Sequence, residues 1–195
     1  MYAARRTYIK QWEYQQPEER YSVCVSLGGK PVAAIRPQTI SVVEEDVMYW
    51  RKANHIHNWF VENVQDGTDN CATYHVSPGD LKALLDACER VIEASELVDG
   101  EVYMGTVYDQ ENPDGKVLTE AGKVIKDPTV AMALLPTRSG FFFGNEDYDQ
   151  DYLESVVETR DWLVRMLAES GDGRFASIVY RSSWERAGRE WLATS

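Results

Sequence analysis

The sequence predicts an α+β fold, in which three main helices pack on a small antiparallel sheet with an N-terminal hairpin. Segments whose apolar residues recur at helical spacing lie at 43–64, 78–92 and 153–167. Short segments rich in valine, isoleucine and tyrosine lie around them and do not alternate regularly with the helices. That order of elements favours an α+β architecture over a doubly wound parallel sheet.

Length and composition indicate a folded chain with its own core. The chain has 195 residues, of which 44% are hydrophobic and 11% are aromatic. We expect an N-terminal strand and hairpin region at 1–38, a helical core with short strands at 39–184 and a polar tail at 185–195, together forming one compact domain. No apolar stretch is long enough to span a membrane and no signal peptide is evident, so we expect a cytoplasmic location.

A hairpin near the N-terminus is the strongest β-strand signal. Residues 21–27 alternate between apolar and polar, Gly28-Gly29 is a two-residue turn signal, and residues 30–35 form the expected partner strand. Residues 7–14 alternate weakly, which is typical of an edge strand.

The longest helical pattern covers residues 43–64 and is expected to organise the rest of the chain. Acidic residues 44–46 would lie in the first turn, where the helix dipole favours them. On this helix Trp50 and His57 should face the core and His55 should face solvent.

Further elements follow from local signals. Ser77 and Pro78 are typical of the N-cap and first residue of a helix, and Cys88 falls on the apolar stripe of that helix. A short helix should begin after Asp127-Pro128. Strands are expected at 71–76, 102–108 and 175–180, with a turn at 112–115.

Three segments together resemble a family of small uncharacterised proteins encoded by phages and prophages. They are YWRKANHIHNWFVENVQ from residue 49, LLPTRSGFFFG from residue 134 followed by YDQDYL, and YRSSW from residue 180. The resemblance extends from Thr39 to Trp184, about three quarters of the chain. It implies a phage origin and expression inside an infected bacterium, and it implies no activity, since none is assigned to that family.

Neither a metal nor a cofactor is expected. His55 and His57 would point about 200° apart on a helix, so they could not share a metal ion with Cys71 or His75. The acidic residues at 144–152 lack the ligand spacing of an EF-hand, which favours a solvated loop. A nucleophilic pair of Cys71 with a histidine would need an orienting partner that the sequence does not reveal.

A candidate ligand site combines the aromatic and basic residues of two motifs. Arginine side chains bind phosphates or carboxylates in a bidentate manner, and aromatic rings stack on bases. The alternative is that the aromatic residues form the core and Arg51 pairs with Glu45 or Asp46. The candidate ligand-binding residues are Tyr49, Trp50, Arg51, Asn54, Trp59, Arg138, Ser139 and Phe142.

The net charge of −12 lies almost wholly in the middle of the chain. Residues 65–150 carry seventeen acidic and six basic side chains, a net charge of −11. Such a chain repels bare nucleic acid, so direct nucleic-acid binding is not expected. The acidic residues either maintain solubility or imitate DNA towards a basic host protein.

Taken together, these patterns predict a phage-type accessory protein that binds without catalysis and interferes with a host process or defence system. Its partner would be a host protein, for example one that binds nucleic acid. One alternative is a protein that sequesters a nucleotide-like small molecule. The other is an enzyme of a class that the motifs do not reveal. A homo-oligomer is compatible with each of them.

Overall fold

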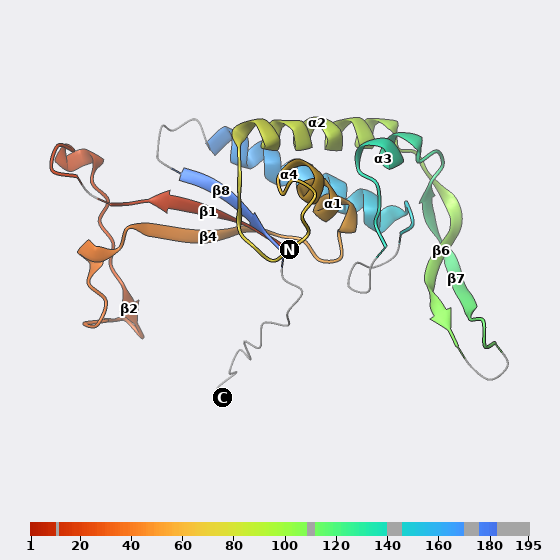
Figure 1. Cartoon of the computed structure of the whole chain (residues 1–195), viewed down its shortest axis with the longest axis horizontal. Helices are drawn as coiled ribbons and strands as arrows, with labels where there is room; N and C mark the ends of the chain where they lie inside the picture. The colour runs from red at the N-terminus through yellow and green to blue at the C-terminus, as the bar shows by residue number, and fades with distance from the viewer. Residues whose placement is uncertain (11, 109–111, 140–145, 170–175, 183–195) are drawn as a thin grey trace.

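The computed structural model describes residues 1–10, 12–108, 112–139, 146–169 and 176–182, and its class is α+β, as predicted (Figure 1). A four-stranded sheet and the helices occupy the middle of the molecule, and a β-hairpin projects at each end. The described elements in chain order are β1 (Tyr2–Tyr8), η1 (Pro17–Glu19), β2 (Ser26–Leu27), β3 (Lys30–Pro31), η2 (Pro37–Thr39), β4 (Val42–Tyr49), α1 (Asn54–Asn63), β5 (Tyr74–Val76), α2 (Pro78–Ala94), β6 (Leu97–Val107), β7 (Lys116–Ile125), α3 (Thr129–Leu134), α4 (Gln150–Glu169) and β8 (Ala176–Arg181).

The central sheet is antiparallel, with strand order β4-β1-β8-β5. The segment from residue 7 to residue 14 was predicted to be an edge strand, and this is wrong. The strand β1 begins at Tyr2 and lies inside the sheet between β4 and β8. Small, buried Ala3 and Ala4 allow the helices and neighbouring strands to approach β1 closely. Since β1 pairs with β4, the division expected at residue 38 falls between two partner strands.

The predicted helix at 43–64 is wrong in its first half. Residues 42–49 form the edge strand β4, and only residues 54–63 are helical. Cross-strand ion pairs hold β4 against β1: Arg5 makes a bidentate pair with Glu45, and Arg6 Nε lies 2.6 Å from Glu44 Oε2. The acidic residues therefore pair with arginines of the neighbouring strand and do not cap a helix.

The predicted helix after Ser77 is confirmed as α2. Ser77 Oγ accepts a hydrogen bond from the Asp80 backbone N–H, and the Asp80 carboxylate accepts one from the Ser77 N–H, which together form a capping box. Cys88 is completely buried, and burial raises the pKa of its thiol to about 12. It acts as a small apolar residue of the core, as predicted.

Replacing Ser77 with alanine should lower the free energy of unfolding by about 1 kcal/mol, since the first N–H groups of α2 then lose their side-chain acceptor. Urea denaturation monitored by circular dichroism measures this change. Ser26→Ala, on an exposed strand outside any helix, is the control and should be neutral. Equal stability of the two variants would show that the capping box contributes nothing.

The core lies where α1, α2 and α4 pack on the sheet, and its centre is aromatic. Trp50 lies between the rings of Phe60, Trp162 and Tyr180, and its centroid is 5.2 Å from that of Trp162. Phe60 stacks on Tyr180 with ring centroids 4.0 Å apart. The turn after β4, the helix α1 and the strand β8 are thereby fixed relative to one another.

The N-terminal hairpin is much shorter than predicted. Gly28 and Gly29 have φ angles of 56° and 76°, which confirms the two-residue turn, because glycine adopts these angles without steric cost. Only two residues on each side pair as β2 and β3. The paired residues are exposed, so no apolar face extends the pairing further.

At the other end of the molecule, β6 and β7 form a long two-stranded ribbon. The predicted strand at 102–108 is confirmed and begins earlier, at Leu97, whereas its partner strand was not predicted. The Gly115 N–H donates to the carbonyl oxygen of Asn112, as expected for the predicted turn.

The remaining expectations are met in part. A short helix follows Pro128, β5 occupies the second half of the predicted segment 71–76, and β8 agrees with the predicted last strand. Phe142, its neighbouring phenylalanines and the polar tail at 185–195 lie outside the described residues. Among the helices of the described ranges, none is both long and apolar enough to cross a bilayer.

Candidate functional site

The two motifs that carry the candidate site meet at a cavity of about 610 Å³. The turn between β4 and α1 contributes Arg51 and Lys52 to its lining, and the start of α1 contributes Asn54 and His55. The segment after α3 contributes Thr137. Cavities of this volume are typical of small-molecule sites. The structure therefore brings Arg51 and Asn54 near the segment around residue 138.

The opposite walls of the cavity come from β6 and α4. Tyr103 and Met104 line it from β6, and Asp151 and Ser155 line it from α4. Asp147, which precedes α4, completes this side. These lining residues were not predicted, because no local pattern in the sequence of β6 indicates that the ribbon lies beside the helices.

The turn that carries Arg51 and Lys52 is tight. Lys52 has a φ angle of 60°, in the left-handed region that side chains other than glycine, asparagine and aspartate rarely adopt. The Asn54 N–H donates to the Lys52 carbonyl oxygen at 3.0 Å, which closes the turn. Both basic side chains are exposed at the cavity mouth. Strain of this kind in a basic turn is common at ligand sites.

Asn54 links the two motifs directly. Its side chain is buried, and its Oδ1 accepts a hydrogen bond from the Arg138 backbone N–H at 3.2 Å. The Arg138 side chain donates to Asn58 Oδ1 and is not part of the cavity lining. Arg138 therefore contributes its backbone to the architecture of the site.

His55 forms the floor of the cavity and is buried, which corrects the prediction that it faces solvent. Its ring packs against Tyr152 with centroids 4.3 Å apart, and its Nε2 lies 2.9 Å from Ser155 Oγ. Burial lowers the pKa of His55 to about 3. The imidazole is therefore neutral at physiological pH.

The hydrogen bond between His55 and Ser155 does not run in the direction that a serine nucleophile and its histidine base require. Ser155 Oγ donates its hydrogen to the Tyr152 carbonyl oxygen at 2.8 Å. His55 Nε2 must then donate to the serine oxygen, so it is not positioned to accept the serine proton. A base with a pKa of about 3 would also be weak at neutral pH. This pair joins α1 to α4 at the cavity floor.

The acidic residues before α4 have structural roles as well as a place at the cavity. Asp149 is buried and accepts a hydrogen bond from the Tyr152 N–H, as an N-cap residue does. Asp147 accepts from the Tyr103 N–H at 3.0 Å and fixes the ribbon to the loop. Asp151, at the start of α4, is exposed and lines the cavity. The sequence indicated a solvated loop, whereas Asp147 and Asp149 of this segment make hydrogen bonds that hold β6 and the start of α4.

Four further residues predicted to bind a ligand lie elsewhere. Trp50 and Trp59 are core residues with 3% and 8% of their surface exposed, and the Trp50 indole N–H donates to Thr159 Oγ1. Tyr49 is exposed and packs on Tyr2 of the neighbouring strand. Ser139 is exposed and outside the cavity lining. For the two tryptophans, the structure shows the alternative in which they form part of the core.

A second buried polar cluster surrounds His57. The Tyr180 hydroxyl lies 2.6 Å from His57 Nδ1, and Asp69 Oδ1 lies 3.1 Å from Nε2. Burial lowers the pKa of His57, and the Asp69 carboxylate opposes that effect. The cluster joins α1 to β8 inside the core. Cys71, which could act as a nucleophile only with an orienting partner, is exposed, while both ring nitrogens of His57 are occupied.

Within the described part of the chain, no three side chains of histidine, cysteine, aspartate or glutamate come close enough to hold a metal ion. A second cavity, of about 570 Å³, is lined by Arg5 at the other end of the sheet. Its arginine pairs with Glu45 and Glu169, so its charge is already compensated. The cavity beside α1 is therefore the better candidate site.

The fold is α+β, and its polar cavity lies between a basic turn and the acidic start of α4. Comparison with protein-family models, curated proteins and solved structures found no match.

Proposed function

We propose that this protein binds a small, anionic, nucleotide-like ligand without catalysis, in the cavity between α1, β6 and α4. The observation that carries the proposal is the meeting of the basic turn with the segment at Thr137 and Arg138, through the Asn54–Arg138 hydrogen bond. Arg51 and Lys52 supply positive charge at the cavity mouth. The start of α1 lies there too, and its helix dipole favours an anion.

The acidic residues of the opposite wall indicate a ligand that carries hydrogen-bond donors as well as an anionic group. Asp147 and Asp151 place carboxylates across the cavity from the basic turn. A lone phosphate would be repelled by them, whereas a nucleotide carries phosphates at one end and amino and hydroxyl donors at the other. The separation of charge in the cavity therefore fits a molecule with both kinds of group.

The resemblance to phage proteins gives this binding a biological role. We propose that in an infected bacterium the protein sequesters a nucleotide that serves a host process or defence system. The alternative of a DNA-like acidic surface is less well supported, because Asp147 and Asp149 serve the ribbon contact and the cap of α4. A pull-down from expressing cells, followed by extraction of small molecules, tests for both a ligand and a host protein.

Calorimetric titration with a panel of linear and cyclic nucleotides tests the proposal directly. At a ligand concentration of 100 times Kd, binding should raise the free energy of unfolding by about 2.7 kcal/mol. Arg51→Ala should abolish the heat of binding and leave the fold intact, because Arg51 is exposed. Arg138→Ala should have a smaller effect, since its backbone N–H to Asn54 remains.

Arg90→Ala is the matched control, since Arg90 is an exposed arginine of α2 outside the cavity lining. It should bind as the unmodified protein does. If no nucleotide in the panel gives heat, or if Arg51→Ala binds as tightly as Arg90→Ala, the cavity is not a nucleotide site.

A further inference from the structure

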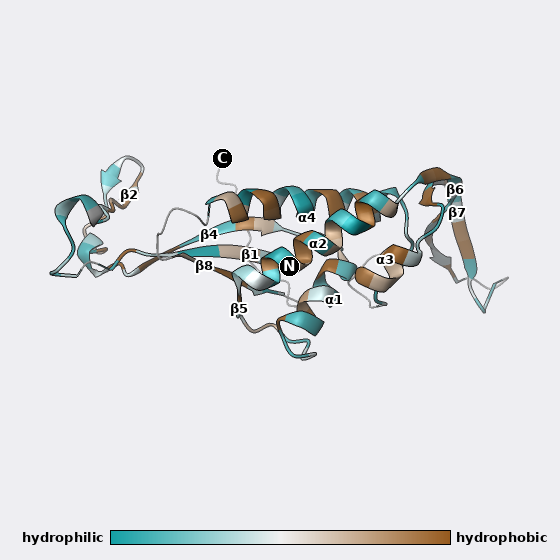
Figure 2. Ribbon diagram, turned by 90° about the horizontal axis from the view of Figure 1, so that it is seen from above, coloured by the Kyte–Doolittle hydropathy of each residue, from teal (hydrophilic) through white to brown (hydrophobic). Residues whose placement is uncertain are grey.

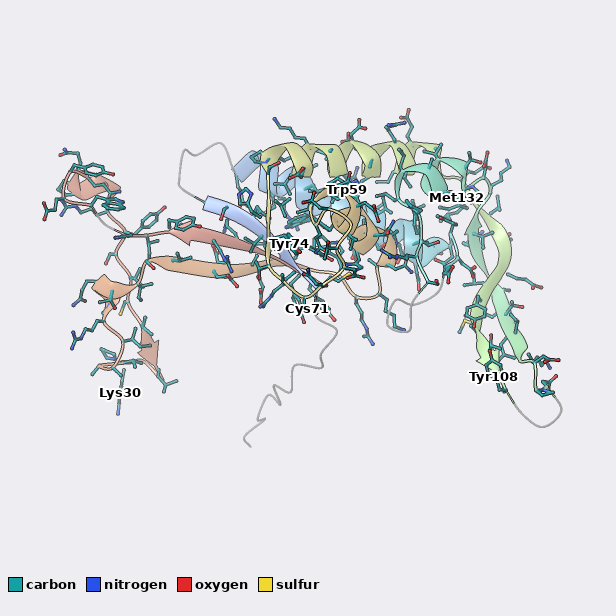
Figure 3. All side chains as sticks on the ribbon, in the orientation of Figure 1. Lys30, Trp59, Cys71, Tyr74, Tyr108 and Met132 are labelled. Carbon is teal, nitrogen blue, oxygen red and sulfur yellow. The ribbon has the colours of Figure 1, made fainter. Side chains whose placement is uncertain are left out.

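The strands β6 and β7 form a two-stranded ribbon that is separate from the central sheet. Its strands pair with each other over almost their whole length and extend away from the helices (Figure 1). Tyr108 lies at its far end (Figure 3). A two-stranded hairpin alone is at best marginally stable in water, and a sheet needs more strands or a covering layer. The outer half of the ribbon is therefore a candidate surface for another strand.

The inner edge of the ribbon is already occupied. Tyr103 and Met104 of β6 line the cavity together with residues of α1 and α4, and Asp147 accepts from the Tyr103 N–H. A register shift between Tyr103 and Gly105 also interrupts the regular pairing of β6. These features make β6 unsuitable for adding a regular strand.

The outer edge belongs to β7 and is open over its first half. Among the described residues, one isolated bridge, from Asp149 to Val124, covers this edge near its end. From Lys116 to Glu120 the side chains are exposed. These five positions include no proline, which would interrupt the hydrogen bonds of an added strand.

The charges along this edge are arranged so that two antiparallel copies of it would be complementary to each other. Lys116, Leu118 and Glu120 occupy alternate positions, so they project from the same face of β7. The partly exposed Val107 of β6 lies on that face as well, since it is paired with Lys116. Figure 2 shows hydrophobic residues along the ribbon, away from the helices. The pattern places one apolar residue midway between a positive and a negative charge.

We propose that two copies of this chain associate by antiparallel pairing of their β7 strands, with a two-fold axis at Leu118. In this register Lys116 of each copy lies opposite Glu120 of the other, and the two Leu118 side chains meet at the axis. The two ribbons then form one four-stranded sheet, in which the two Leu118 side chains are neighbours. A symmetric dimer needs such a surface, because its interface is the same patch on both copies.

A charge-reversal experiment tests this register. Lys116→Glu places like charges opposite each other twice in the dimer, and Glu120→Lys does the same with the opposite sign. Each single variant should weaken dimerisation roughly tenfold or more, as measured by sedimentation velocity over a range of protein concentrations. The double variant Lys116→Glu/Glu120→Lys should dimerise as the unmodified protein does.

Mixing the two single variants in equal amounts is the decisive measurement, since their charges are complementary only in a mixed dimer. The mixture should recover dimerisation that neither variant shows alone, and a hairpin disrupted by substitution could not recover in this way. Lys82→Glu, an exposed charge reversal on α2, is the control and should leave association unchanged. A monomer at every concentration, single variants that dimerise normally or a mixture that stays monomeric would each overturn the proposal.

Discussion

Replacing Trp50 with alanine is expected to lower the free energy of unfolding by about 3–5 kcal/mol, the usual cost of removing a large aromatic side chain from a core. The indole is buried between Phe60, Trp162 and Tyr180, so its loss opens a cavity where α1, α4 and the sheet meet. Urea denaturation gives the difference directly. A loss below about 1 kcal/mol would be typical of a surface site and would contradict the packing.

Part of that cost comes from one buried hydrogen bond. The Trp50 indole N–H donates to Thr159 Oγ1 at 2.9 Å, while Thr159 itself donates to the Ser155 carbonyl oxygen. Trp50→Phe keeps most of the ring volume and removes this donor, so it should cost about 1–3 kcal/mol. Trp12→Ala is the matched control, because Trp12 is about half exposed in the N-terminal region. It should change stability by less than about 1 kcal/mol.

Acidification below pH 6.5 is the second change with a large expected effect. His55 has a pKa of about 3 in the folded protein, against the ordinary value of 6.5. Between these values the unfolded chain binds a proton that the folded protein does not bind. Unfolding therefore takes up a proton, and stability falls as pH decreases. Above pH 6.5 His55 is neutral in both states and contributes no pH dependence.

The expected slope is up to about 1.4 kcal/mol per pH unit for one such histidine, or about 2 kcal/mol between pH 6.5 and 5. Burial shifts the pKa of His57 in the same direction, so it adds to the slope. Asp99 and Asp127 have lowered pKa values, so they make stability depend on pH only near and below their ordinary pKa of 3.8. Burial also lowers the pKa of the Met1 ammonium from its ordinary value of 8.0, so the share of His55 is measured by comparing variants at the same pH.

His55→Gln should flatten this pH dependence, because glutamine cannot take up a proton and can still donate to Ser155. His75→Gln is the control, since His75 is exposed on β5 and should leave the slope unchanged. Free energies of unfolding at several pH values compare the two variants. An unchanged slope for His55→Gln would show that His55 is accessible to protons in the folded state.

The candidate site was predicted in part. Arg51 and Asn54 lie at the cavity because the motif around them forms the turn that enters α1. Trp50 and Trp59 belong to the core. The local spacing of aromatic residues does not distinguish a side chain that lines a site from one that packs in the core. Asp151, Ser155 and Tyr103 reach the cavity from distant elements, and no local pattern marks them.

Elements whose stabilising contacts join residues close together in the chain were predictable from local patterns. The capping box of Ser77 and Asp80 fixes the start of α2, and Gly28-Gly29 fixes a turn, because in each case the interacting groups lie within a few residues. The apolar stripe of α2, including Cys88, also follows directly from its spacing.

Local patterns could not show which residues of 42–64 form a strand and which form a helix, because long-range pairing makes that choice. The spacing of Val43, Val47 and Trp50 fits a helix, and the polar residues between them fit an exposed edge strand equally well. Pairing with β1, through Arg5 and Arg6, selects the strand. That choice depends on arginines about forty residues away in the sequence, and a local pattern carries no information on such partners.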